Sequence, residues 1–427
     1  MTHSIHDVGQ RPAGTWAGFM GVAALVAMVC LGLNPQAAFS AEKDKGQQIS
    51  RVIAKEMTAA QKALQASQWA EAVKNLEAAE TKPGLNAFDK MKVADFKGFA
   101  YVKLNKLKEA QQAYEQAMAT GAYPPEDAAK TTKMLFRITA GSQQNAKAIE
   151  YGKQVAESGT ANADDLGIIS QLYYLQKDCK NSAIWADKAV AAARKAGEAP
   201  KENLFQFKLQ CASDAGDTPG MDAASIDLIR LTNKTNYWNT LLRIERQDER
   251  DDHNLLMIYR IMYDTSSMTV GTDFIEMAQL LGDAALPAEA QAVLEKAMGA
   301  GLINDQQKER TTRLLNSFKS RAETDKKGQA QLDAEATKNA AGELDVKLGE
   351  VYYGSGDYQN SVTAITRGIG KGQIKHPDEA YVYLGRAQAA LKNSAEAKKA
   401  FAGLKTVPNV SPRVLKLWEL YADTLGR

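Results

Sequence analysis

The sequence predicts an all-α protein, a right-handed solenoid of about ten stacked antiparallel helix pairs of uneven quality. Two observations lead to this fold class. One short residue pattern recurs along residues 41–427 of the 427-residue chain, and its 11 prolines are few and fall mostly between the predicted helices. Repeats of this length indicate units that cannot bury their apolar faces alone and therefore stack on one another.

The recurring pattern has a small residue in a first helix, a large residue three positions later, and then an Ala and another large residue in a second helix. In the clearest copy these are Gly98, Tyr101, Ala110 and Tyr114. Further copies contain Gly349, Gly385 or Ala278 as the first small residue. We expect the small residues where paired helices approach most closely, and the large ones between neighbouring helices.

This pattern is similar to that of tetratricopeptide repeats, in which Leu-Gly-x-x-Tyr precedes an Ala, an aromatic residue and a later Pro. Aligning the glycines and the second-helix alanines predicts where each unit begins and a terminal helix from about Pro412. The alternative is an ordinary helical protein with Ala-rich amphipathic helices, because the units near residues 200 and 307 match poorly. The alanines used are Ala72, Ala148, Ala183 and Ala290, and the predicted starts are 53, 91, 129, 164, 200, 235, 271, 307, 342 and 378.

The first forty residues differ from the rest. An uncharged run follows Arg11 and extends over residues 12–41, and Ala38 and Ser40 are small residues at the two positions that a signal peptidase reads. We interpret residues 1–40 as a secretory signal that is cleaved near Ser40, which predicts a periplasmic protein. The alternative is an uncleaved segment that anchors the protein in the inner membrane and leaves it facing the periplasm.

The rest of the chain is predicted to contain three parts. Residues 41–303 form an N-terminal solenoid of the tetratricopeptide type, and residues 342–427 form C-terminal repeats and a terminal helix. Residues 304–341 are the most polar part, with few large apolar residues after Phe318. They are interpreted as either a loosely packed unit or a hinge.

Two cysteines follow the predicted signal, Cys179 and Cys211, in a compartment that favours disulfides. In the predicted register Cys179 follows the first helix of one unit and Cys211 lies late in the first helix of the next. Since these helices run in the same direction, both sulfurs come to the same end of the stack. We predict a disulfide between them; the alternative is two independent buried thiols.

The sequence gives little support for catalysis, and we expect neither enzymatic activity nor a cofactor nor a metal. His253 and His376 are not at ligand spacing from another histidine or a thiol, and no zinc-protease helix or serine elbow occurs. The glycine-rich residues 368–372 lack the spacing of a phosphate loop. With 53 basic and 51 acidic side chains, no global field attracts nucleic acid.

The resemblance to tetratricopeptide repeats implies that first helices line a concave groove, along which protein or peptide partners lie. Asn239, Arg243 and Arg246 recur at spacings of four and three, so they share one helix face and could hold a carboxylate or a peptide backbone. The alternative is that residues 243–252 form a solvated, internally paired helix end. The inward positions selected in this register are Lys103, Asn239, Arg243, Arg246, Tyr353 and Arg386.

A finer resemblance rests on Tyr237-Trp238-Asn-Thr-Leu241, Leu286-Pro287, Ala290, Leu294 and Gly301-Leu-Ile303. These residues are similar to a group of periplasmic tetratricopeptide proteins found alongside TonB-type energy-transduction systems. The leading hypothesis is therefore a scaffold in TonB-linked transport or envelope assembly. The alternatives are a carbohydrate- or peptidoglycan-binding solenoid and an enzyme with a composite site. The sequence identifies neither the partner, nor the oligomeric state, nor the occupied end of the groove.

Overall fold

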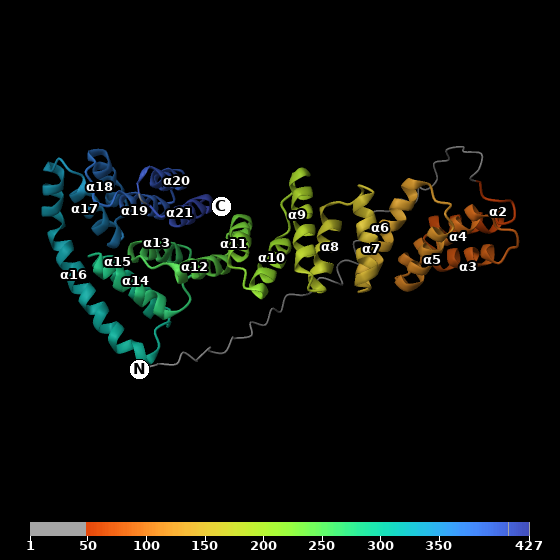
Figure 1. The fold of residues 1–427 in the computed structure, drawn as a ribbon, viewed down its shortest axis with the longest axis horizontal. Helices are drawn as coiled ribbons and strands as arrows, with labels where there is room; N and C mark the ends of the chain where they lie inside the picture. The colour runs from red at the N-terminus through yellow and green to blue at the C-terminus, as the bar shows by residue number, and fades with distance from the viewer. Residues whose placement is uncertain (1–47, 409, 427) are drawn as a thin grey trace. The chain divides into compact units, whose positions relative to one another are not determined.

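The computed structural model describes residues 48–408 and 410–426, which form helices joined by short connections, with no strand among them. Contacts divide the chain into two compact units, residues 1–207 and 208–427 (Figure 1). The helix α10 (Glu202–Ala215) crosses this boundary. The division falls between residues 207 and 208. The parts bounded at residues 303–304 and 341–342 stay a prediction.

The described part of the first unit is a stack of four helix pairs. The two helices of each pair pack on each other, and successive pairs are joined by packing of α3 on α4, α5 on α6, and α7 on α8. The helices are α2 (Ala54–Gln65), α3 (Trp69–Glu80), α4 (Ala87–Lys103), α5 (Leu107–Ala119), α6 (Pro125–Gly141), α7 (Asn145–Glu157), α8 (Ala163–Leu175) and α9 (Cys179–Lys195).

The second unit combines helix pairs with a long single helix and a terminal helix. Its helices after α10 are α11 (Thr218–Thr232), α12 (Thr235–Asp248), α13 (Asp252–Asp264), α14 (Gly271–Asp283), α15 (Pro287–Gly299), α16 (Asp305–Lys338), α17 (Glu343–Gly354), α18 (Tyr358–Lys371), α19 (Pro377–Ala390), α20 (Ser394–Ala402), the 3-10 turn η2 (Gly403–Thr406) and α21 (Pro412–Thr424). The predicted terminal helix from Pro412 is thus confirmed.

The second unit also returns on itself. Its last helix, α21, packs on α20 and also on α13 and α11, which lie far back along the chain. Additional contacts join α15 to α17 and α17 to α19. In the described part of the first unit, by contrast, the main helix contacts are all between helices consecutive in the chain.

The helix pairs are built on the small residues that the repeat pattern identifies. A Cβ placed on Gly98, Gly349 or Gly385 would lie 2.7, 2.2 or 2.5 Å from the side chain sixteen residues later, which is Tyr114, Ile365 or Phe401. These distances are far shorter than a normal carbon–carbon contact of about 3.5–4.0 Å. The three glycines therefore occupy equivalent positions, as predicted, and each lets a large side chain of the second helix touch the first helix directly.

The second-helix alanines also follow the prediction, with one correction. Ala72, Ala148 and Ala290 are completely buried, but Ala183 is only half-buried. The buried small residue at the equivalent position is Ser182, twelve residues after Ser170, and its carbonyl accepts a 2.8 Å hydrogen bond from the Ser170 hydroxyl. The predicted register is therefore one residue out in this unit, because two small residues are adjacent in the sequence there.

A second regularity, absent from the repeat pattern used for the prediction, lies at the start of first helices. The third residue of α4, α8, α14 and α17 is an aspartate that is at most 3% exposed, at Asp89, Asp165, Asp273 and Asp345. Asp89 and Asp165 complete capping boxes with the asparagine before the helix. Each box satisfies two backbone N–H groups that the helix itself leaves without partners.

The same aspartates connect each helix to another element. Asp89 accepts a hydrogen bond from the backbone N–H of Ser50, and Asp165 pairs with Lys133 of α6. Asp345 pairs with Lys371 of α18 at 2.8 Å. A buried carboxylate requires such partners, so one residue type fixes both where a helix begins and what it packs against.

The polar segment 304–341 differs from the predicted helix pair of the unit near 307. It contains one continuous helix of 34 residues, α16, in place of two. The segment has no proline and is rich in Ala, Gln, Glu and Lys, which favour helix over a turn. Thr311, Leu315 and Phe318 are buried in its first half, and a Cβ on Gly282 of α14 would lie 2.7 Å from Phe318.

The predicted signal segment, residues 1–40, lies outside the described residues. Within the described residues, none of the helices combines the length and the apolar character that a membrane span requires.

The contact at Gly385 can be tested with a matched pair of Gly→Ala variants. Gly385→Ala should lower the free energy of unfolding by about 1–3 kcal/mol, because the new methyl group overlaps the Phe401 ring. Gly328→Ala, on α16 with open space around it, should raise the free energy by about 0.5–1 kcal/mol through helix propensity. Urea denaturation measures both values. Equal effects of the two variants would contradict the close approach of α19 and α20.

Candidate partner-binding surfaces

Three helices of the second unit meet around a buried group of charged and polar residues, which we call the ionic core. Its members are Arg260 and Asp264 on α13, Glu289 on α15, and Tyr383 and Arg386 on α19. Arg260 and Tyr383 are 0% exposed and Arg386 is 2% exposed. Two arginines face two carboxylates, so the charges of the ionic core balance.

Arg386 binds both carboxylates of the ionic core. Its Nε and Nη2 donate to the two oxygens of Asp264 at 2.8 and 3.0 Å, and its Nη1 donates to Glu289 Oε1 at 2.5 Å. Its guanidinium also lies 4.7 Å from the ring centre of Tyr353 on α17. Bidentate pairing of this kind fixes the orientation of both partners.

Arg260 of α13 completes the ionic core. Its Nη2 donates to the Tyr383 hydroxyl at 2.8 Å, and that hydroxyl donates to Glu289 Oε2 at 2.5 Å. Burial raises the pKa of Tyr383 well above its ordinary value, so the hydroxyl keeps its proton. Burial would also raise the pKa of Glu289, but Arg386 and Arg260 hold it below its usual value. Glu289 is therefore an ionised acceptor for two donors, Tyr383 and Arg386.

The ionic core corrects one prediction from the sequence. Tyr353 and Arg386 lie close together, but Arg386 is buried and does not line an open groove. Helices α13 and α15 supply Asp264 and Glu289, 122 and 97 residues away from Arg386, and these residues occupy its guanidinium. A partner could reach Arg386 only by displacing them.

Three further predicted residues lie on α12, and they divide into two kinds. Asn239 donates to the carbonyl of Ser267 at 2.7 Å, and Arg246 donates to the Tyr259 hydroxyl at 2.9 Å and pairs with Asp273. Both residues thus hold α12 against the following helices. Arg243 is exposed. The binding of a partner by Arg243 stays a prediction.

The last predicted residue, Lys103, ends helix α4 in the first unit. It is half-buried, and its Nζ lies 5.4 Å from the ring centre of Phe99 on the same helix. This cation–π contact places the ammonium beside an aromatic ring while leaving part of the side chain at the surface. Its role toward a partner also stays a prediction.

A histidine joins α13 to α19 at the edge of the ionic core. His253 Nε2 lies 2.5 Å from Asp378 Oδ2, and its Nδ1 lies 3.6 Å from Glu379 Oε1. The hydrogen bond with Asp378 raises the pKa of His253. Burial would raise the pKa of Asp378, but His253 lowers it below its usual value. The imidazolium is therefore the form that satisfies both carboxylates.

Glu350 of α17 faces the same junction. Burial and the neighbouring charge of Glu379 raise the pKa of Glu350 well above its ordinary value. An ionised Glu350 next to Glu379 is unfavourable, since like charges repel each other in a site with little water. The junction thus contains one carboxyl that favours its neutral form and one histidine that favours its charged form.

Cys179 begins α9 and Cys211 lies in α10, and both are disulfide-bonded in the structure. The pairing of these two thiols with each other stays a prediction for the protein in solution, and it is tested below.

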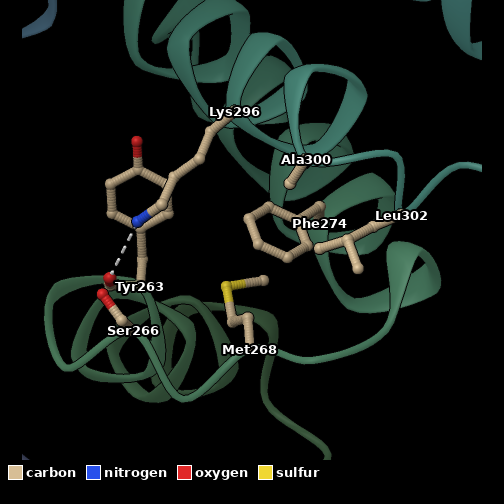
Figure 2. Close-up of a pocket in the computed structure, with 7 residues that line it drawn as sticks. All are labelled: Tyr263, Ser266, Met268, Phe274, Lys296, Ala300 and Leu302. Atoms are coloured by element: carbon tan, nitrogen blue, oxygen red, sulfur yellow. Dashed lines mark hydrogen bonds between the residues drawn. The ribbon is translucent and has the colours of Figure 1, made fainter.

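Each of the two units contains a small pocket. One, in the first unit, has a volume of about 250 Å³ and is lined by Glu80, Leu85, Lys90, Val93, Ala94, Gln116 and Thr120. The other, which we call the Lys296 pocket, has a volume of about 150 Å³ (Figure 2). Both lie below the ~300 Å³ at which sites for drug-sized molecules begin.

The Lys296 pocket lies where the turn between α13 and α14 meets α14 and the end of α15. The side chains of Met268, Phe274 and Leu302 approach one another on one side, and Lys296 extends along the other side toward Tyr263 (Figure 2). The Lys296 Nζ lies 3.4 Å from the Tyr263 carbonyl oxygen and 4.0 Å from its ring centre. Across residues 48–408 and 410–426, no group of His, Cys, Asp and Glu side chains is arranged to hold a metal ion.

No protein-family model and no curated protein matches this sequence. Among solved structures, the chain is similar to a tetratricopeptide repeat protein from Parabacteroides merdae (12% identity, 63% of this chain, 99% of that chain, TM-score 0.33). It is also similar to the TPR2AB domain in the pHSP90 complex of yeast Sti1 (14%, 62%, 98%, 0.34) and to the C-terminal part of a TPR repeat-containing protein from Cytophaga hutchinsonii (12%, 84%, 98%, 0.31). At these identities and scores nothing about function follows. The described helices themselves show an all-α solenoid of stacked pairs, as predicted.

The two arginines of α12 give opposite predictions. Arg246→Met should lower the free energy of unfolding by about 2 kcal/mol, because it leaves the buried Asp273 carboxylate without its partner. Arg243→Met should change it by less than about 0.5 kcal/mol, as expected for an exposed side chain. Chemical denaturation of both variants separates the two roles. A loss of stability with Arg243→Met that equals the loss with Arg246→Met would contradict this assignment.

The junction at His253 predicts a dependence of stability on pH. Since the folded-state pKa of His253 is raised, its contribution is complete below its unfolded pKa of about 6.5 and is lost as the pH rises through the folded pKa. Asp378, with a lowered pKa, contributes above its unfolded pKa and loses this contribution as the pH falls through its folded value. The pair is therefore strongest between the unfolded pKa values of Asp and His, which are about 3.9 and 6.5.

Unfolding free energies of wild type and His253→Gln at several pH values test this dependence. The difference between them should be largest in mildly acidic solution and should shrink as the pH rises above about 6.5. His376→Gln, at an exposed neighbouring histidine, is the control. A difference that grows with pH would exclude the charged form of His253 as the stabilising one.

The predicted disulfide fixes the number of free thiols per chain before and after reduction. The protein purified without reductant and unfolded in denaturant should show no free thiol from Cys179 and Cys211, and reduction should release two. Reduction should also lower the free energy of unfolding by about 3–4 kcal/mol, the value expected for a closed loop of about 32 residues. Two free thiols per chain before reduction would disprove the bridge.

Proposed function

We propose that this chain is a non-enzymatic scaffold that binds protein or peptide partners along the helix stack of its first unit. The observation that carries the proposal is the contrast between the two units. In the second unit, α13 and α15 fill the face of α19 that carries Arg386. In the described part of the first unit, helices make their main contacts with their neighbours in the chain, so no other helix of that unit covers the stack.

We also propose that the protein works in the periplasm, in TonB-linked transport or envelope assembly. The predicted signal over residues 1–40 and the two disulfide-bonded cysteines support the location. The resemblance of residues 237–241 and 286–303 to the proteins that accompany TonB-type systems supports the role. An inner-membrane anchor facing the periplasm is the alternative location.

Site-specific photo-crosslinking in intact cells tests the scaffold function. A photoreactive residue at position 103, on the first helix α4, should form discrete adducts with one or a few proteins, which mass spectrometry identifies. The same residue at position 108, an exposed position on the second helix α5, is the matched control. Equal labelling at both positions, or adducts with cell-wall fragments in place of proteins, would contradict the proposal.

The location is tested separately by cell fractionation and by sequencing the N-terminus of the purified protein. We expect the protein in the periplasmic fraction, with an N-terminus close to residue 41. Recovery of an intact chain from the cytoplasmic fraction would exclude the proposed location while leaving the crosslinking result to stand alone.

A further inference from the structure

We propose that the Lys296 pocket is an anchor site on the second unit for a peptide segment of a protein partner, and that it takes an apolar side chain followed by an acidic residue. This inference rests on the proposed scaffold function, but it concerns a different surface from the helix stack of the first unit. Three properties of the pocket identify its occupant. They are the size of the space, the charge of Lys296, and the position of the Lys296 ammonium relative to the apolar side chains.

The size of the pocket suits one apolar side chain. Its volume of about 150 Å³ matches that of apolar cavities that accommodate a single benzene ring. Phe274 is 3% exposed and Met268 is 6% exposed, so the apolar side of the pocket is held by residues embedded in the helix packing. A pocket already formed by buried residues needs no rearrangement to receive a Phe or Leu side chain, which favours binding.

The charge of the pocket suits an anion. The Lys296 ammonium lies against the Tyr263 ring and donates to the Tyr263 carbonyl, which is a neutral acceptor. Burial lowers the pKa of Lys296, and the nearby charge of Asp264 does not offset this effect. A carboxylate brought to Nζ would restore the favourable environment of the charged form, and a charge-assisted hydrogen bond of this kind is stronger than a neutral one.

The positions of these two features identify the source of the carboxylate. Figure 2 shows the ammonium at the Tyr263 side of the pocket and the apolar side chains of Phe274 and Leu302 on the other side. A chain-terminal carboxylate is attached to the same Cα as its side chain and would sit directly above the apolar group. The acidic side chain of the following residue reaches farther, so an internal apolar–acidic sequence fits better than a C-terminal residue.

A further observation favours a peptide over a small molecule. Val270, four residues before Phe274 at the start of α14, is 49% exposed. It is an exposed apolar side chain two residues after Met268 of the pocket in the chain. A peptide that anchors one side chain in the pocket would continue across Val270, whereas a benzene-sized molecule would leave Val270 in water.

The test uses the full chain labelled on its Met methyl groups and three probes: acetyl-Phe-Glu-amide, acetyl-Phe-Gln-amide and acetyl-Phe with a free carboxylate. Titration followed by methyl NMR should shift the Met268 signal. The Glu peptide should bind about tenfold more tightly than the Gln peptide, the change expected for one charge-assisted contact. It should also bind more tightly than acetyl-Phe with its free terminus.

Two variants and a control locate the effect. Lys296→Met should abolish the preference for Glu over Gln while leaving the Met268 shift, and Ala300→Trp, which fills the opening, should abolish binding of all three probes. Lys398→Met, at an exposed lysine on α20, should behave as wild type. Thermal melting of each variant establishes that it is folded.

Equal affinities for the Glu and Gln peptides, or a preference that survives Lys296→Met, would overturn the proposal. Tighter binding of the free-carboxylate probe would overturn the assignment to an internal sequence. These outcomes are independent of the scaffold function, because crosslinking at position 103 reports on the first unit. Discrete adducts there with no binding at the Lys296 pocket would leave the proposed function intact and disprove this inference alone.

Discussion

The second unit depends on the pairing of two arginines with two carboxylates in its interior. Removing four charges from water is costly, and such a cluster is tolerated only when every charge has partners in good geometry. Arg386 satisfies both Asp264 and Glu289, and Arg260 reaches Glu289 through Tyr383. Because these residues come from α13, α15 and α19, the ionic core selects one arrangement of these helices. The Arg386 side chain, which the repeat pattern would assign to partner binding, therefore stabilises the fold.

The same repeat pattern thus supports two different organisations. Both units use a small residue in the first helix that touches a large residue sixteen positions later, as at Gly98 with Tyr114 and Gly385 with Phe401. This contact specifies only how two consecutive helices pack. It leaves the residues on the inward face of the first helix free to vary. In the second unit charged residues on α13 and α15 close that face, whereas the main contacts of the described first unit stay between consecutive helices.

This division explains what the sequence could and could not predict. Helix pairs, their starting residues and the equivalence of Gly98, Gly349 and Gly385 depend on contacts twelve to sixteen residues apart, which a sequence pattern records. The ionic core joins Arg386 to Asp264 across 122 residues, and no local spacing reports such a pair. Helix α16 was missed because a repeat of fixed length demands a turn that its residues do not favour. The Lys296 pocket is formed by a turn and the ends of two helices, and its residues are individually ordinary.

The most direct test of the closed second unit is a double-mutant cycle between Asp264 on α13 and Arg386 on α19. Unfolding free energies are measured for wild type, Asp264→Asn, Arg386→Met and the double variant. Direct pairing predicts a coupling energy of about 1–3 kcal/mol, because each single change leaves the other charge buried without its partner. A coupling energy within about 0.3 kcal/mol of zero would mean that the two side chains do not meet, and that the inward face of α19 is open.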